Sequence, residues 1–142
     1  MEIRTVGWSS PLMAKALELR KAVFVSEQSV PPELEIDEMD EAAIHFLLLL
    51  EGDAAATLRL LPQDNCAKIG RVAVRRDLRS TGLGTKLMKA ALAHALRAGF
   101  PEAILDAQLD SIPFYEKLGF SAEGEIFMDA GIPHRGMRLK LA

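Results

Sequence analysis

A short arginine- and glycine-rich segment, Arg79 to Gly84, has the residue types that bind phosphate groups. It follows a β-branched run that ends at Val74 and leads into an amphipathic run from Gly82 onward. A strand, a basic loop and a helix in this order place free backbone N–H groups at the positive end of the helix. Gly82 and Gly84 would let the backbone approach a pyrophosphate without an intervening Cβ, and Arg79 would add a charged donor. The segment therefore predicts an anion-binding loop.

Two common nucleotide-binding motifs do not fit this loop. The dinucleotide motif fails because Leu87 stands where its third glycine belongs, and no acidic residue closes a following strand at the required place. The Walker motif fails because the chain has no Gly-Lys-Ser/Thr sequence. A bare Gly-x-Gly also begins many ordinary helices, so the surroundings of the loop must decide its role.

The elements that would position the loop follow from apolar periodicity. Strands are expected over residues 2–8, 43–50, 54–61, 66–74, 103–107, 121–127 and 135–141, and helices over 11–27, 82–98 and 111–118. Ser10 and Pro11 indicate the start of the first helix, Arg20 is expected off its apolar stripe, and residues 62–65 are expected to form a turn. This order predicts one mixed α/β domain over residues 1–142 with a largely antiparallel front half.

Composition excludes several other classes of protein. A net charge of −3 argues against nucleic acid as the main partner, because phosphate-backbone binders usually carry a basic excess. Cys66 is the only cysteine, so neither an intramolecular disulfide nor a thiolate zinc cage can form, and no metal site is expected. The longest apolar run, residues 42–50, is too short to span a membrane, and no signal peptide is evident. We expect a cytoplasmic protein without a membrane partner.

Three segments resemble the GNAT superfamily of N-acetyltransferases, over essentially the whole chain. They are residues 68–74 (KIGRVAV), 79–84 (RSTGLG) and 114–120 (FYEKLGF). Further features resemble the ElaA-like branch of that superfamily; they are residues 20–28 (RKAVFVSEQ), Glu35, Asp37, Asp40, His45 and residues 107–108. The resemblance implies a mostly antiparallel twisted sheet flanked by helices, with the fourth strand splayed from the fifth, pantetheine in the gap and the pyrophosphate on residues 79–84.

The resemblance also implies which residues bind acetyl-CoA as co-substrate. They are Val72, Ala73, Val74, Arg79, Ser80, Thr81, Gly82, Leu83, Gly84, Thr85, Gln108 and Tyr115. Backbone N–H groups of residues 72–74 would hold pantetheine and polarise the thioester carbonyl. Two positions depart from the pattern, because many relatives have glycine at Ser80 and asparagine at Gln108.

Acetyl transfer to an amine needs a proton donor for the thiolate and a base for the amine. The resemblance places Tyr115 at the position of the general acid, although a core aromatic would also fit that site. Glu27, His45 and His134 are alternative bases, with ordered water as a fourth; His45 also fits a core residue and His134 a turn residue. The acidic segment, residues 33–41, is expected to be an exposed or site-facing loop that either attracts a cationic amine or is simply solvated.

These features predict an acyl-CoA N-acyltransferase that moves an acetyl group from acetyl-CoA to an amine by direct attack in a ternary complex. Cys66 lies in a predicted strand, so a covalent acyl-enzyme is not expected. A non-catalytic acyl-CoA sensor and an unrelated nucleotide-binding domain are the alternatives. A small-molecule acceptor is favoured over a protein, and a homodimer is expected because edge strands of such sheets often pair. The sequence does not identify the acceptor.

Overall fold

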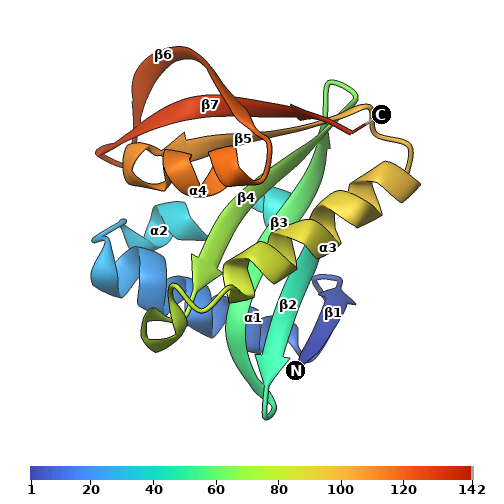
Figure 1. The fold of residues 1–142 in the computed structure, drawn as a ribbon. Helices are drawn as coiled ribbons and strands as arrows, with labels where there is room; N and C mark the ends of the chain where they lie inside the picture. Colours follow the sequence, from blue (N-terminus) through green and yellow to red (C-terminus); the bar gives the residue numbers. More distant parts are fainter. Residues whose placement is uncertain (142) are drawn as a thin grey trace.

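The computed structural model describes residues 1–141, which fold around one seven-stranded sheet (Figure 1). The strand order is β1-β2-β3-β4-β5-β7-β6. The strands are β1 (Glu2–Val6), β2 (Ile44–Leu50), β3 (Asp53–Gln63), β4 (Cys66–Val74), β5 (Glu102–Gln108), β6 (Ser121–Asp129) and β7 (Ile132–Lys140). All neighbours are antiparallel except β4 and β5, which are parallel. The predicted element order and mixed sheet are confirmed.

Helices cover both faces of this sheet. They are α1 (Met13–Arg20), which continues as a π-helical stretch (Lys21–Glu27), α2 (Pro32–Glu35), α3 (Leu83–Arg97) and α4 (Ile112–Lys117). Alternate residues of β2 explain why that strand is an unbroken apolar run: Phe46 and Leu48 pack in the core cluster beneath α3, whereas Leu47 packs with Met13 and Ala16 of α1. Among residues 1–141 no helix is long and apolar enough to span a bilayer.

The parallel pairing of β4 with β5 is very short. It joins only residues 67–69 to residues 103–105. Beyond these residues β4 continues to Val74 and β5 to Gln108, but the two strands no longer pair with each other (Figure 1). Beyond Ile69, the backbone groups of β4 that face β5 therefore lack a strand partner. The predicted splay between the fourth and fifth strands is confirmed, and it opens the sheet beside α4.

Two predicted boundaries were wrong. The first helix begins at Met13, so Pro11 is not its first residue; the Ser10 hydroxyl instead accepts a hydrogen bond from the Leu12 N–H (3.2 Å). Strand β3 runs through Pro62, and the following turn contains only residues 64 and 65. A proline is tolerated there because β2 pairs with β3 only as far as Leu60, which leaves that edge of β3 free.

Candidate active site

The arginine- and glycine-rich loop lies at the N-terminus of α3, as predicted. Gly82 precedes the helix in the left-handed conformation (φ 86°), and no side chain caps the first N–H groups of α3. Ser80 is also left-handed (φ 64°), which explains why glycine suits this position. Gly84 is different, because a Cβ there would lie 3.2 Å from Val74 Cγ2 and 3.5 Å from Phe114 Cζ. Its small size therefore allows α3 to pack closely against β4 and α4.

Arg79 and Glu27 form an exposed ion pair beside this loop. The guanidinium Nη1 and Nη2 atoms donate to the two carboxylate oxygens at 2.8 and 2.9 Å, and Nε donates to the Val74 carbonyl. The hydrogen bonds from Arg79 hold the pKa of Glu27 below its ordinary value. Glu27 therefore lies next to the loop before α3 and is a weaker base than an unpaired glutamate.

Substitutions at this pair separate binding from proton transfer. On the sequence-based expectation that this loop binds acetyl-CoA, Arg79→Ala should raise the KM for acetyl-CoA about tenfold with little change in kcat, because it would remove a charged hydrogen bond to phosphate. We expect Glu27→Gln to leave kcat within about twofold of wild type, since the variant would lose only the ion pair that holds the Arg79 side chain in place. Steady-state kinetics on both variants measure these values; a loss of about 100-fold in kcat for Glu27→Gln would instead make Glu27 the base.

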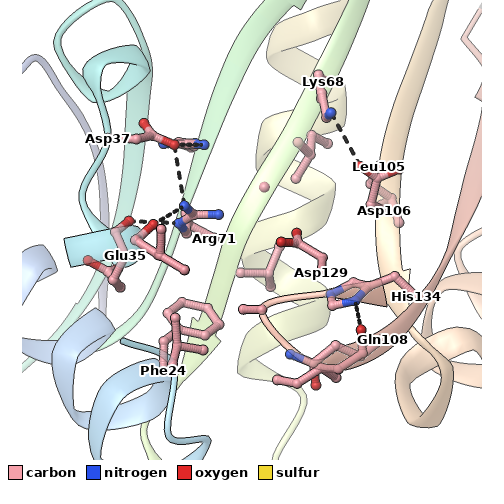
Figure 2. Close-up of a pocket in the computed structure, with 18 of the residues that line it drawn as sticks. Phe24, Glu35, Asp37, Lys68, Arg71, Leu105, Asp106, Gln108, Asp129 and His134 are labelled. Carbon is pink, nitrogen blue, oxygen red and sulfur yellow. Dashed lines mark hydrogen bonds and ion pairs between the residues drawn. The ribbon is translucent and has the colours of Figure 1, made fainter. Parts of the chain in front are cut away.

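A cavity of about 480 Å³ opens at the splay, bounded by β4, β5, α2, the end of the first helix and the β6–β7 hairpin. Figure 2 shows Phe24, Glu35 and Arg71 on one side of it and Gln108, Asp129 and His134 on the other. Gln108, one of the residues expected to bind the cofactor, also ties the two sides together. Its Nε2 donates to Gln28 Oε1 at 2.8 Å.

Tyr115 projects from α4 into this cavity. Its ring is buried (8% exposed) and packs edge-on against Phe114 and Phe120. No hydrogen bond among residues 1–141 engages its hydroxyl, and no buried side-chain polar atom there lacks a partner, so solvent reaches the hydroxyl from the cavity. Burial raises the pKa of Tyr115 to about 12, so the phenol stays protonated at every physiological pH.

The acidic segment is not a solvated loop. It folds as α2 and a 3-10 helix (Glu38–Glu41), and it buries Glu35 and Asp40. Arg20, predicted to be off the apolar stripe, is itself 1% exposed and donates to Glu35 at 2.6 Å and to Asp40 at 2.8 Å. Arg59 bonds Asp37 and Asp40. These internal ion pairs neutralise Glu35, Asp37 and Asp40. The other acidic side chains of the segment, Glu33, Glu38 and Glu41, are exposed and have no ion-pair partner among residues 1–141.

This network makes stability sensitive to acid. Burial alone would raise the pKa of Asp40, but hydrogen bonds from Arg20, the Asp37 N–H and Arg59 lower it from 3.8 to about 2. The charged form is therefore favoured in the folded state, and its contribution, about 2 kcal/mol, is complete above pH 4 and lost as the pH falls toward 2. Denaturant unfolding at pH 6 and pH 3 measures the loss, and Asp40→Asn should flatten the dependence.

A β-bulge on β4 presents Arg71 at the cavity wall. Residues 71 and 72 stand against one residue of β3, and Arg71 has φ 51°, an unusual conformation for a side chain of this size. Its guanidinium donates to the Leu34 and Glu35 carbonyls at the end of α2 and to Asp37 (Figure 2). The bulge and these contacts set the shape of β4 where the strand leaves β5.

The three histidine and glutamate candidates for the base occupy different places. His45 is 1% exposed, its Nε2 lies 2.9 Å from the Asp40 carbonyl, and burial lowers its pKa; it does not line the cavity. Glu27 does not line it either. His134 does, and it lies within β7 rather than in the predicted turn, because the hairpin turns tightly at Ala130 and Gly131. The structure thus brings only His134 of the three to the cavity that holds Tyr115.

Sequence reasoning missed Arg59 and Arg71 as residues of the cavity wall. Arg59 had a usable signal, since a lone arginine within the apolar strand of residues 54–61 requires a buried partner. Arg71 lies within the predicted strand of residues 66–74, and nothing in the sequence indicates that its side chain binds α2. The bulge that turns it away from the sheet has no marker in the sequence.

A family model described as an acetyltransferase (GNAT) domain matches residues 12–141. The chain belongs to the GNAT family. The uncharacterized N-acetyltransferase YjcF of Bacillus subtilis is 38% identical over 123 residues, covering 86% of this chain and 88% of YjcF. Solved structures of an acyl-CoA N-acyltransferase from Pseudomonas aeruginosa and of Escherichia coli ElaA match with TM-scores of 0.87 and 0.86, at 33% and 31% identity, each covering 96% of this chain and 97% of the other.

Membership of the GNAT family confirms the resemblance drawn from the sequence, including the likeness to ElaA. The whole-chain structural match also shows that this fold is shared with an acyl-CoA N-acyltransferase. The protein is thus a GNAT acyltransferase-family domain whose acceptor the comparisons do not identify.

Proposed function

We propose that this protein transfers an acetyl group from acetyl-CoA to an amine. The observation that carries the proposal is the open splay between β4 and β5, which leads from the loop before α3 to a cavity containing the Tyr115 hydroxyl. A thioester in this gap would have unpaired backbone groups of β4 on one side and a phenol on the other. This arrangement supports carbonyl polarisation and protonation of the departing sulfur.

The donor would be held along β4 and the loop. Backbone groups of residues 72–74 would bind the pantetheine amides and the thioester oxygen, because they have no strand partner on the β5 side. The free N–H groups of residues 82–85 and the Arg79 guanidinium would bind the pyrophosphate. Ser80, Thr81 and Gln108 would complete the contacts, with Gln108 near the thioester end of the cavity.

Direct attack in a ternary complex is the mechanism that this geometry supports. A covalent route would need a nucleophile beside the thioester, and Cys66 is at the opposite end of β4 and does not line the cavity. The acceptor would enter from the side of α2 and the β6–β7 hairpin, where the cavity is lined by both apolar and charged residues. A small-molecule amine suits a cavity of about 480 Å³ better than a protein substrate does.

Ligand binding and thiol release test the proposal. Acetyl-CoA at 100 times its Kd should stabilise the protein by about 2.7 kcal/mol, and ATP and NAD should not. Release of free thiol with a panel of amines then separates an enzyme from an acyl-CoA sensor. Stabilisation without thiol release from any amine would favour the sensor, and absence of stabilisation would reject an acetyl-CoA site. A cytoplasmic location and a homodimer stay predictions.

A further inference from the structure

The β6–β7 hairpin carries a histidine on the acceptor side of the cavity. His134 lies on β7 opposite Gln108 of β5 and Phe127 of β6. Its ring stacks on Phe127, with centroids 5.9 Å apart and planes inclined by 23°. The side chain is 9% exposed and lines the same cavity as Tyr115. Packing therefore fixes the ring while leaving it in contact with the cavity.

One hydrogen bond fixes the tautomer of this histidine. His134 Nδ1 lies 2.7 Å from the Ile132 carbonyl oxygen. A carbonyl can only accept, so Nδ1 must carry the hydrogen. In the neutral ring Nε2 is therefore left with a free lone pair, and no hydrogen bond among residues 1–141 occupies it. A neutral imidazole held in this way is a proton acceptor already oriented for use.

The charges around His134 suit an incoming ammonium group. Across the cavity, Arg71 and Asp37 are paired with each other, and Lys68 pairs with Asp106 on β5. Asp129, which faces the cavity from the same hairpin, has no ion-pair partner among residues 1–141 (Figure 2). Glu35, which is paired with Arg20, and Arg59, which is paired with Asp37 and Asp40, also line the cavity. Tyr115 on α4 lines it as well. Among the described residues, Asp129 is thus the unneutralised carboxylate that lines the cavity from the hairpin that carries the imidazole.

We propose that His134 Nε2 removes the proton from the acceptor amine, which enters as an ammonium attracted by Asp129. This inference rests on the proposed function. The ammonium first gives one proton to Nε2, and the freed nitrogen lone pair attacks the thioester carbonyl carbon. The C–S bond then breaks, and the sulfur takes the Tyr115 hydroxyl proton. The attacking nitrogen loses its extra proton to restore Tyr115, so the products are an amide, free CoA, and one proton on His134 that passes to solvent.

The variant His134→Asn tests this role, because the Asn amide can still donate to the Ile132 carbonyl in place of Nδ1 while Nε2 is removed. We expect kcat near pH 7 to fall at least about 100-fold. Activity of the variant should rise continuously toward the pKa of the amine itself, whereas wild type reaches a plateau earlier. His94→Asn, at a half-buried histidine of α3 outside the cavity, should keep the wild-type profile. A wild-type pH profile for His134→Asn would overturn the proposal.

A second readout does not depend on turnover. Nitrogen NMR of labelled histidine should show His134 as the Nδ1–H tautomer when neutral, with the signal assigned by its loss in His134→Asn. The opposite tautomer would remove the free lone pair from Nε2 and contradict the proposal. Absence of thiol release by wild-type protein with every amine would reject the proposed function instead, whereas normal stabilisation of His134→Asn by acetyl-CoA would show that the donor site is intact.

Discussion

Tyr115→Phe should lower kcat in the thiol-release assay by about 10²- to 10⁴-fold, the usual loss when a general acid is removed. The phenol has a pKa of about 12, so it is a constant hydrogen-bond donor and a weak acid. Burial disfavours a thiolate in the same surroundings, which raises the basicity of the sulfur and favours proton transfer to it. Since Tyr115 remains protonated, the loss should be similar across the working pH range.

Two controls separate chemistry from packing in this variant. The phenyl ring keeps its contacts with Phe114 and Phe120, so the melting temperature and the KM for acetyl-CoA should stay close to wild type. A donor whose thiol is more acidic should recover part of the lost rate, because its sulfur leaves without protonation. Equal kcat values for both proteins with acetyl-CoA would mean that Tyr115 is only a core aromatic.

Arg20→Met should lower the free energy of unfolding by about 3–5 kcal/mol. The substitution keeps a good helix former in α1 but removes the donors to Glu35 and Asp40, which are 4% and 0% exposed. Two carboxylates would then be buried without their main partner. Denaturant unfolding monitored by circular dichroism measures the change.

The exposed pair of Arg75 and Asp77 supplies a matched control for this prediction. Arg75→Met should change the free energy of unfolding far less than Arg20→Met does, because both side chains of this pair are well solvated. Adding Glu35→Gln and Asp40→Asn to Arg20→Met should recover part of the stability, since the unpaired charges are gone. A cost for Arg20→Met as small as that of Arg75→Met would mean that water reaches the network.

Local patterns, together with the family resemblance, were sufficient for the fold. The helix after Gly82 and the short helix that carries Tyr115 both agree with expectations from short segments. The predictions that were wrong concern side chains whose partners lie far away in the sequence. Arg20 meets acids that lie 15 and 20 residues away, and only the folded chain makes its burial favourable.

Backbone conformation was the other source of error. The hairpin before His134 turns at Ala130 (φ 51°) and Gly131 (φ 77°). Gly131 indicated a turn but not how short it is, because alanine seldom adopts a positive φ, and His134 was left outside the strand. The bulge at Arg71 similarly depends on its pairing with β3 and on the acceptors that α2 offers to its guanidinium. Neither feature follows from residue types alone.

The three-residue pairing between β4 and β5 divides the sheet into two half-sheets, one of four strands and one of three. Such a seam is mechanically soft, so amide hydrogens along it should exchange sooner than those inside either half. Under the proposed function, the pantetheine arm would lie in the gap and pair its amides with β4, much as an added strand completes a sheet edge. Binding of the donor substrate would then hold the two half-sheets together. The protein would behave as one rigid body only while the donor is bound.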